Sequence, residues 1–254
     1  MFKLKVITLK INILTLENVL NQILQFAFSL KSSYVCVANV HMSIEAYRDE
    51  DFKKLVNNAD LVIPDGMPLS RAIKMLYGIK QDRIAGMDLL PRLLIEAEKN
   101  DLGVFFYGGT LEMLELTKKY VQVNYPKIVK HYYYNPPFRN LDTDEENIII
   151  NLINDKKVNL VFVVLGCPKQ EKWMAYMKGK INACMIGIGG ALPVLVGIQK
   201  RAPKWMQQTS LEWFFRFMQE PKRLFKRYLI TNSYFIILFS KQFILKKRHS
   251  KGEY

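Results

Sequence analysis

A carboxylate follows directly after a short apolar run, in the sequence Leu-Val-Ile-Pro-Asp-Gly at residues 61–66. The run is typical of a buried strand, so Asp65 is expected at the carboxyl end of that strand. In open α/β sheets this edge binds ligands, and a carboxylate there can take a proton from an attacking hydroxyl. Because Asp-Gly is also a common turn pair, a catalytic base and a plain turn both remain open for Asp65.

Two polar side chains are candidates for contacts to a sugar and to a phosphate. Asn39 follows an apolar run at residues 34–37, where it either hydrogen-bonds a sugar or caps the helix that begins before His41. Arg83 precedes a glycine turn and a helix. A guanidinium in that place can hold a diphosphate through two parallel hydrogen bonds, and a solvated arginine is the alternative.

Glycine turns follow several apolar runs, where a nucleotide can approach the backbone closely. One turn contains Gly108 and Gly109, and another contains Gly187, Gly189 and Gly190. A lone glycine pair is weak evidence for a nucleotide site. Turns at equivalent strand ends together favour one ligand-binding edge over unrelated loops.

The segment Gly-Cys-Pro-Lys-Gln-Glu-Lys-Trp, residues 166–173, is a further junction of this kind. It follows an apolar run, and the free N–H groups of the helix that begins there suit an anion such as a diphosphate. Lys169 is a candidate for a diphosphate contact, or belongs to a solvated helix face. An ordinary strand-to-helix connection is the alternative for the whole segment.

Asp142 and Asp144 fit the Asp-x-Asp pattern with which many sugar transferases bind a divalent ion. The pair follows a loop rather than an apolar strand, and Asp144 begins an acidic run that suits a helix N-terminus. Helix capping is therefore the preferred interpretation, and no metal site is predicted. The sequence also has no Walker-type phosphate loop. Arginine, lysine and backbone N–H groups are expected to meet the charge of any leaving diphosphate.

The composition predicts a folded intracellular protein with a basic carboxyl-terminal part. Half of the 254 residues are hydrophobic, which excludes a disordered chain. Of the net charge of +14, residues 200–254 contribute +10, from 13 Lys and Arg against 3 Asp and Glu. Three cysteines without metal-ligand spacing indicate reduced thiols in a cytosolic setting, and no secretion signal is recognised.

Apolar runs alternate with helical patterns through residues 1–199, which predicts an α/β domain with a Rossmann-like, mostly parallel sheet and helices on both faces. Residues 131–139, rich in tyrosine and proline, are expected to form a loop. A hairpin is expected at residues 4–14, and further strands at 34–37, 61–63, 104–107, 128–131, 160–165 and 184–188. The expected helices are residues 15–30, 41–58, 67–77, 87–99, 110–123, 143–154 and 169–179.

Residues 200–254 predict a helical appendage, with helices at 204–219, 221–229 and 233–247 and no strands. Its apolar stretch at residues 228–240 is too short to span a bilayer. Aromatic and basic side chains alternate, which suits a helix lying in the headgroup layer of an anionic membrane, while helices packed on the core are the alternative. No nucleic-acid-binding motif accompanies the charge. The side chains expected to meet the membrane or a lipid diphosphate are Trp213, Arg216, Lys222, Arg223 and Arg227.

Taken together, these motifs resemble the WecG/TagA/CpsF family of bacterial glycosyltransferases, glycosyltransferase family 26. The resemblance covers most of the chain, in the family's order. The matching segments are V-A-N at 37–39, A-D-L-V-I-P-D-G at 59–66, R-I-A-G-M-D-L at 83–89, F-F-Y-G-G at 105–109, L-G-C-P-K-Q-E-K-W at 165–173, G-I-G-G at 187–190 and K-R-A-P-K-W-M-Q with L-E-W-F-F-R and E-P-K-R-L-F-K-R-Y within 200–228.

The resemblance implies metal-independent, inverting transfer of a sugar, N-acetylmannosamine or a related hexose, from a UDP-sugar to a polyprenyl-diphosphate-linked saccharide. This reaction would serve cell-surface polysaccharide or teichoic acid synthesis. It implies a peripheral enzyme on the cytoplasmic face of the bacterial membrane, with no cofactor, no nucleic-acid partner and a possible homo-oligomeric state.

The resemblance also implies roles for single residues. Asp65 is expected to be the general base, Asn39 and Gln170 to contact the sugar or the acceptor, and Arg83 to bind the diphosphate. The turns at Gly108 and Gly187 are expected to contact the nucleotide. The arginines of the appendage would contact the lipid diphosphate and complete the site on the membrane.

Three positions depart from the family's pattern, at Val37, Ala85 and Pro193. Val37 replaces a threonine that the family often has, so a hydroxyl expected near the sugar is missing. Ala85 stands where threonine is usual, and Leu192-Pro193 replaces a common Phe-Asp pair. These departures keep open an alternative from another class, a non-catalytic nucleotide- or lipid-binding scaffold.

Overall fold

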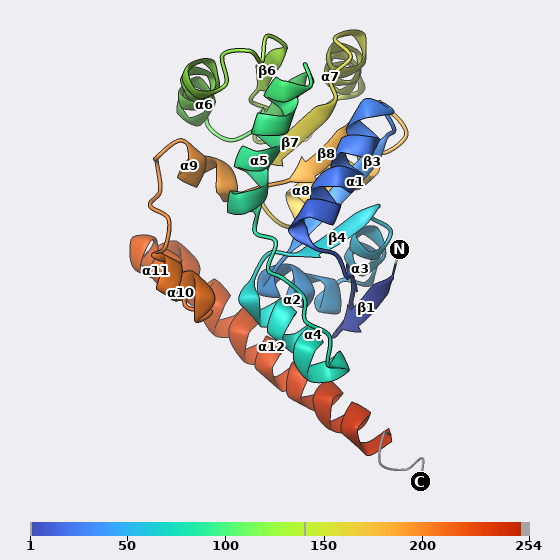
Figure 1. Cartoon of the computed structure of the whole chain (residues 1–254), viewed down its shortest axis with the longest axis vertical. Helices are drawn as coiled ribbons and strands as arrows, with labels where there is room; N and C mark the ends of the chain where they lie inside the picture. Colours follow the sequence, from blue (N-terminus) through green and yellow to red (C-terminus); the bar gives the residue numbers. More distant parts are fainter. Residues whose placement is uncertain (1, 140, 250–254) are drawn as a thin grey trace.

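The computed structural model describes residues 2–139 and 141–249 and contains a six-stranded sheet in which every pair of neighbouring strands is parallel (Figure 1). The strand order is β4-β3-β8-β7-β5-β6, so strands far apart in sequence become neighbours. This confirms the predicted α/β fold with its parallel sheet. The strands are β3 (Ser33–Ala38), β4 (Leu61–Pro64), β5 (Val104–Gly108), β6 (His131–Tyr134), β7 (Leu160–Val164) and β8 (Cys184–Gly187).

Helices cover both faces of the sheet because alternate side chains of its strands belong to two separate hydrophobic clusters. In β3, Tyr34 and Cys36 pack on one face and Val35 and Val37 on the other. The first face carries α2 (Val40–Arg48), α3 (Glu50–Asn57), α4 (Met67–Tyr77), α7 (Thr143–Asp155) and α8 (Lys169–Met177). The second carries α1 (Leu16–Phe28), α5 (Gly86–Lys99), α6 (Leu111–Asn124) and α9 (Ala191–Leu195).

The predicted amino-terminal hairpin is present as β1 (Lys3–Val6) and β2 (Leu9–Asn12), a separate antiparallel pair. Residues 41–58, predicted as one helix, are two. Asp49 interrupts them because its side chain accepts a hydrogen bond from Phe52 N at 2.9 Å and so begins α3.

The sixth strand differs from the prediction in position. It was expected at residues 128–131, with the tyrosines after it in a loop, but β6 spans His131–Tyr134. Its tyrosines lie beside aromatic residues of β5, as in Tyr134, which stacks on Tyr107 with ring centroids 5.9 Å apart. Aromatic side chains suit an edge strand that is half-buried, and cross-strand stacking of this kind stabilises the pairing.

The carboxyl-terminal part consists of α10 (Lys204–Gln208), α11 (Glu212–Gln219) and α12 (Pro221–His249). The helices predicted at 221–229 and 233–247 form the single helix α12. The polar residues between them do not end it, since the Thr231 hydroxyl donates to the Arg227 carbonyl oxygen at 2.9 Å within the helix. Because α12 is continuous, the helix Pro221–Arg248, in which an 18-residue window has mean hydropathy 1.2, is long and apolar enough to cross a membrane by length and composition alone. The stretch expected to be too short is therefore part of a longer apolar helix.

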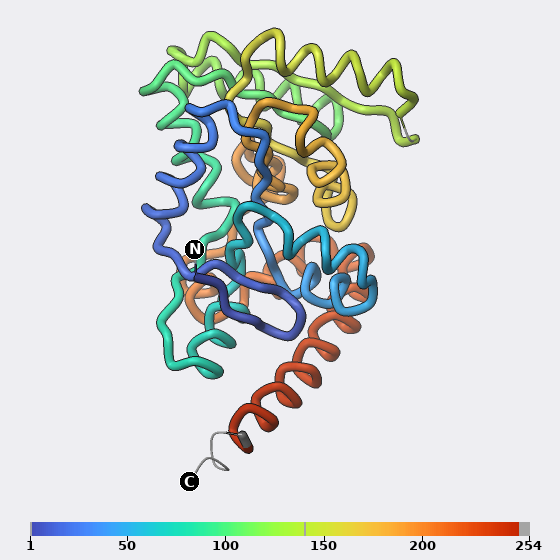
Figure 2. The backbone as a smooth tube through the Cα atoms, turned by 90° about the vertical axis from the view of Figure 1, so that its right-hand side faces the viewer, coloured from blue at the N-terminus to red at the C-terminus, as the bar shows by residue number. Residues whose placement is uncertain are grey.

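The last helix packs along α2 and α4 and continues beyond them (Figures 1 and 2). Phe235 is buried in the hydrophobic core, and the Arg48 guanidinium lies 4.8 Å from the ring centre of Tyr234. The Gln242 side chain accepts from Ile7 N at 2.7 Å and donates to Lys5 O at 3.0 Å. These contacts hold the appendage on the domain that contains the sheet.

Candidate functional site

The candidate site lies at the carboxyl edge of β4, β3 and β8, where the appendage meets the sheet domain. Asp65 directly follows β4, and its N–H donates to the Ala38 carbonyl oxygen at 2.8 Å. One carboxylate oxygen of Asp65 accepts from Gly86 N, at the start of α5, at 3.0 Å. These two bonds fix the carboxyl at the predicted edge.

The environment of Asp65 favours a basic carboxylate. Burial raises the pKa of Asp65 above 3.8, while the Gly86 N–H and the nearby guanidinium groups of Arg216 and Arg83 oppose the rise. A carboxyl with a raised pKa binds a proton more readily than an exposed one, and such groups cluster at functional sites.

Arg83 lies in the same region, and carboxylates surround it. Its side chain is 12% exposed and donates to Asp88 at 2.9 Å and to the Gln207 side chain at 3.0 Å. It also forms an ion pair with Glu212 of α11. The predicted solvated alternative is therefore wrong, because Arg83 is largely shielded from solvent and links the sheet domain to the appendage.

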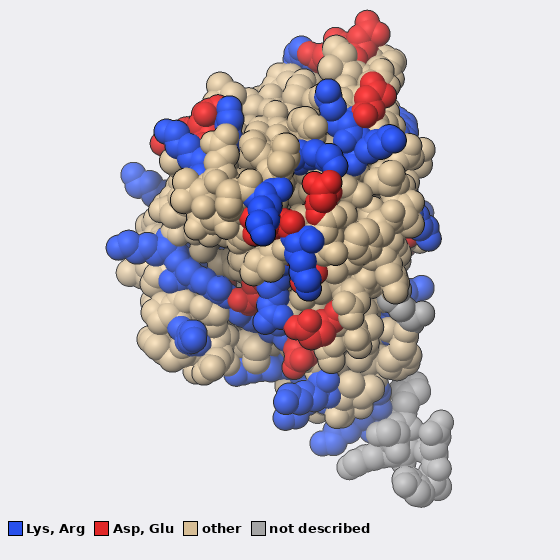
Figure 3. All heavy atoms as spheres, turned by 45° about the horizontal axis from the view of Figure 1, so that its top comes forward, with Lys and Arg blue, Asp and Glu red and all other residues tan. Residues whose placement is uncertain are grey.

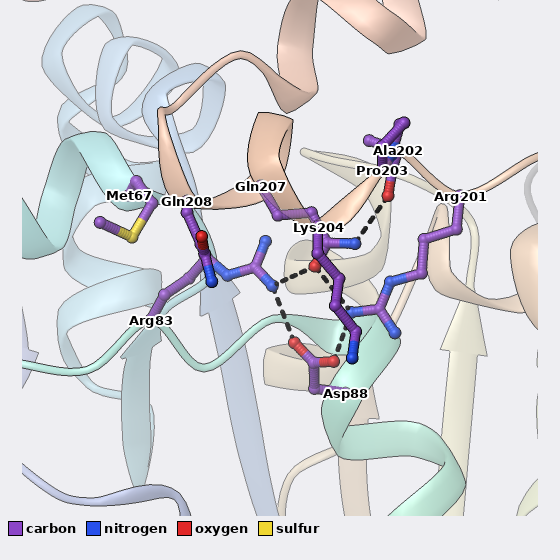
Figure 4. A pocket seen from close by; sticks show the side chains of 9 residues that line it. All are labelled: Met67, Arg83, Asp88, Arg201, Ala202, Pro203, Lys204, Gln207 and Gln208. Carbon is purple, nitrogen blue, oxygen red and sulfur yellow. Dashed lines mark hydrogen bonds and ion pairs between the residues drawn. The ribbon is translucent and has the colours of Figure 1, made fainter.

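A cavity of about 530 Å³ opens beside Arg83 (Figure 4). Arg201 reaches into it from the appendage side and pairs with Asp88, which also holds Arg83. Lys204 adds a third cationic side chain to the lining (Figure 4). The cavity is therefore positively charged in part and can accept an anionic group. Its lining residues are Met67, Arg83, Asp88, Arg201, Ala202, Pro203, Lys204, Gln207 and Gln208.

The glycine turn after β8 holds two side chains from distant parts of the chain. A Cβ atom placed on Gly187 would lie 2.9 Å from Gln170 Nε2, and one placed on Gly189 would lie 3.2 Å from Gln170 Oε1. A Cβ atom on Gly190 would overlap the guanidinium of Arg216. The side chains of α8 and α11 occupy the space that a larger residue would fill, so a larger residue here would displace Gln170 or Arg216.

Asn39 begins α2 and caps it, since its side-chain oxygen accepts from Met42 N at 3.1 Å. This confirms the capping alternative, and a contact from Asn39 to a sugar stays a prediction. His41, one residue into α2, has its pKa lowered by burial and by the nearby charge of Arg227 on α12. The appendage therefore also reaches the edge next to β3.

The remaining predicted residues are spread around this edge. Gly108 and Gly109 form a turn with φ of 99° and 86°. A Cβ atom on Gly108 would lie 2.8 Å from the Val164 carbonyl oxygen, so close strand packing also accounts for this glycine. Lys169 is exposed at the start of α8. A role for these three residues in nucleotide binding stays a prediction.

Three of the five predicted membrane residues are exposed, whereas Arg216 lies against Gly190 and Arg227 lies near His41. Lys222 and Arg223 are exposed, and Arg223 pairs with Glu220 of the preceding turn. Trp213 is 40% exposed and packs edge-on against Tyr228. On the face shown in Figure 3, lysine and arginine side chains are scattered over both the upper and the lower half, with acidic side chains among them.

Asp142 caps α7, because its side chain accepts from Glu145 N at 2.9 Å in a capping box. This confirms the capping interpretation of the Asp-x-Asp sequence. Within residues 2–139 and 141–249, no group of three or more His, Cys, Asp or Glu side chains is placed to hold a metal ion.

Sequence reasoning gave no role to several residues that build the site. Glu212 and Gln207 contact Arg83 from the appendage, and Asp88 and Arg201 form an ion pair beside it. Glu171 is buried behind Gln170. All five belong to the motifs quoted above, so the motif spacing was the available signal, but their pairings depend on the fold.

The three departures from the family pattern are buried near this edge. Val37 is 6% exposed and Ala85 1%, and Pro193 is buried in α9. A Cβ atom on Gly86 would contact Val37 and Ala191, so Val37 packs close to the residue whose N–H holds Asp65, and Ala85 directly precedes that residue.

Comparison with known proteins assigns the chain to a family. The model described as Glycosyl transferase WecG/TagA/CpsF family matches residues 4–249. A Bacillus subtilis (strain 168) protein named N-acetylglucosaminyldiphosphoundecaprenol N-acetyl-beta-D-mannosaminyltransferase is 28% identical over 86% of this chain and 84% of that protein. A Staphylococcus aureus (strain MW2) protein of the same name is 29% identical over 77% of this chain and 76% of its own length. Because the family match extends over nearly the whole chain, this protein belongs to the WecG/TagA/CpsF family of glycosyltransferases.

Proposed function

We propose that this protein transfers N-acetylmannosamine or a related hexose from a UDP-sugar to a polyprenyl-diphosphate-linked saccharide, without a metal ion and with inversion. The names of the relatives support the sugar and the class of acceptor. The observation that carries the proposal is the position of Asp65, a carboxyl with a raised pKa between the sheet edge and the arginines of the site. The UDP-sugar is the donor substrate, and no cofactor is needed.

In this reaction Asp65 is the general base. It removes the proton from the acceptor hydroxyl while that oxygen forms a bond to the anomeric carbon of the donor sugar. The bond from this carbon to the diphosphate breaks on the opposite side, and its electron pair leaves with UDP. One displacement of this kind inverts the anomeric configuration.

Arginine side chains stabilise the charge that develops on the leaving diphosphate. Arg83 and Arg216 both lie close enough to Asp65 to influence its pKa. Arg83 is held by Asp88 and Glu212, so a diphosphate bound to Arg83 would replace one of these carboxylates. Guanidinium groups bind a diphosphate well in a site that excludes water, because their charge is poorly screened there.

The outer surface of α12 supports a peripheral position on the cytoplasmic face of the membrane, where a lipid-linked acceptor is accessible. Several large apolar side chains of this helix are more than half exposed, and basic side chains flank them. A helix of this composition binds an anionic bilayer through apolar burial and charge attraction. The exposed apolar residues are Phe225, Leu229, Ile236, Ile237 and Ile244.

The substitution Asp65→Asn tests the proposal. The amide oxygen of the variant can still accept from Gly86 N, so the turn is retained while the base is lost. We expect transfer to fall by at least about 100-fold, the usual contribution of general base catalysis, while UDP affinity changes by less than about twofold. Asp82→Asn, at an exposed position in the loop between α4 and α5, is the matched control and should leave transfer unchanged.

Transfer is measured with a panel of UDP-sugars and a synthetic lipid-diphosphate acceptor. Near-normal turnover of Asp65→Asn would exclude Asp65 as the base. A wild-type protein that binds UDP but transfers no sugar from the panel would instead favour the non-catalytic scaffold.

A further inference from the structure

A pair of buried polar side chains lies behind the glycine turn that follows β8. Gln170 is 5% exposed and Glu171 is 0% exposed, both in the first turn of α8. Gln170 Nε2 donates to Glu171 Oε1 at 2.7 Å. The other oxygen of each side chain, Gln170 Oε1 and Glu171 Oε2, is buried without a hydrogen-bond partner.

The glycine turn shows where the unpartnered amide oxygen lies. Gln170 Nε2 is the atom nearest to a Cβ built on Gly187, whereas Gln170 Oε1 is the atom nearest to one built on Gly189. The next residue, Gly190, lies against the guanidinium of Arg216. The oxygen is therefore turned along the backbone toward the end of the turn that borders the candidate site.

A buried acceptor without a partner destabilises a protein by about 1–3 kcal/mol. Such a group is expected where a ligand supplies the missing hydrogen bond. A carboxylate can only accept hydrogen bonds, so the NH₂ group of Gln170 must face Glu171. Reversing the amide would bring two acceptor oxygens together, and the ionised Glu171 thereby fixes the orientation of Gln170.

We propose that Glu171 is a positioning residue that holds the amide oxygen of Gln170 toward the transferred sugar, where it accepts a hydrogen bond from a hydroxyl or an acetamido N–H. This inference rests on the proposed function. Glu171 itself does not touch the substrate, because its side chain lies behind Gln170 and contacts Cys167 on its other side. The pair selects donor sugars that offer a hydrogen-bond donor and does not contribute to binding of the UDP part.

The substitution Glu171→Gln tests this arrangement. Its amide can face Gln170 with either an oxygen or an NH₂ group, so the orientation of Gln170 is no longer fixed. Calorimetry without acceptor measures the affinity for UDP-N-acetylmannosamine and for UDP. We expect about tenfold weaker binding of the UDP-sugar, equal to a loss of about 1.4 kcal/mol, and less than about twofold change for UDP. Lys172→Gln, at the next position, is the matched control, because its side chain is 52% exposed.

A second variant separates positioning from a structural role. Gln170→Met removes the amide and should weaken binding of the UDP-sugar to a similar extent as Glu171→Gln. In the Gln170→Met background, Glu171→Gln should have no further effect, because Glu171 acts only through the amide.

Three outcomes overturn the inference. In the first, Glu171→Gln weakens binding of UDP and of the UDP-sugar equally. In the second, Glu171→Gln has its full effect in the Gln170→Met background. In the third, Gln170→Met binds the UDP-sugar with normal affinity. A wild-type protein that binds neither UDP nor the UDP-sugar is a different result, since it contradicts the proposed function itself.

Discussion

The substitution Glu171→Gln should stabilise the folded protein above neutral pH. Burial of the Glu171 carboxyl raises its pKa from 4.5 to about 7. Between these values the folded chain holds a proton that the unfolded chain has lost, so the free energy of unfolding falls as the pH rises and levels off above pH 7. At about 1.4 kcal/mol for each pH unit between the two pKa values, the carboxyl destabilises the fold by about 3 kcal/mol at pH 8 and about 1 kcal/mol at pH 5.

Urea denaturation of the wild type and the variant at both pH values measures this difference. The variant should be more stable by about 3 kcal/mol at pH 8 and by about 1 kcal/mol at pH 5, because its side chain is neutral throughout. Glu145→Gln is a control that should change the stability in the opposite direction. Arg139 lowers the pKa of Glu145, so loss of the Glu145 carboxylate should destabilise the protein at pH 8. A Glu171→Gln variant that is no more stable than wild type at pH 8 would refute the reasoning.

Three further predictions concern the appendage and the diphosphate. Gly190→Ala should lower kcat/KM by about tenfold or more in a steady-state transfer assay, because the added methyl group displaces Arg216. Unchanged kinetics would contradict the contact between Gly190 and Arg216. The double substitution of Ile236→Asn and Ile237→Asn should reduce flotation with anionic vesicles by about tenfold or more. The control Ile148→Asn, at a side chain of α7 that is 60% exposed, should float like the wild type. Equal flotation of the double variant and the control would exclude α12 as the membrane contact. Chelation with EDTA should leave transfer intact, and a strict requirement for Mn²⁺ or Mg²⁺ would be incompatible with a metal-independent reaction.

The sheet was predictable because its strands are buried on both faces and so appear as continuous apolar runs. β7, for example, is Leu-Val-Phe-Val-Val. β6 was misplaced because its sequence, His-Tyr-Tyr-Tyr, has no aliphatic residue, and its stability comes from stacking on β5, which no local pattern reveals. The polar residues around Thr231 predict a helix end, but α12 is continuous because a threonine hydroxyl can bond within the helix.

Only the site residues that directly follow a strand could be predicted from the sequence. Asp65 and the glycine turns follow from the rule that ligands bind at the carboxyl edge of a parallel sheet. The ion pair between Arg83 and Glu212 joins residues separated by 129 positions, so its existence depends on how the appendage folds back. A single sequence contains the two charges but not their contact.

The charges around Asp65 constrain how a diphosphate can bind. Arg83, Arg201 and Arg216 face the carboxyls of Asp65, Asp88 and Glu212, so the cluster is formally balanced before substrate arrives. A diphosphate placed beside this cluster without displacing a carboxylate would add negative charge that Lys204 of the cavity lining offsets only in part, which is unfavourable in a partly buried site. Burial and the charge of Asp65 already raise the pKa of Glu212, so this carboxyl is the one most readily displaced from Arg83 or neutralised by a proton. Because Glu212 belongs to α11, binding of a diphosphate at Arg83 would be coupled to the position of the appendage, which Gln207 and Arg201 also join to Arg83 and Asp88.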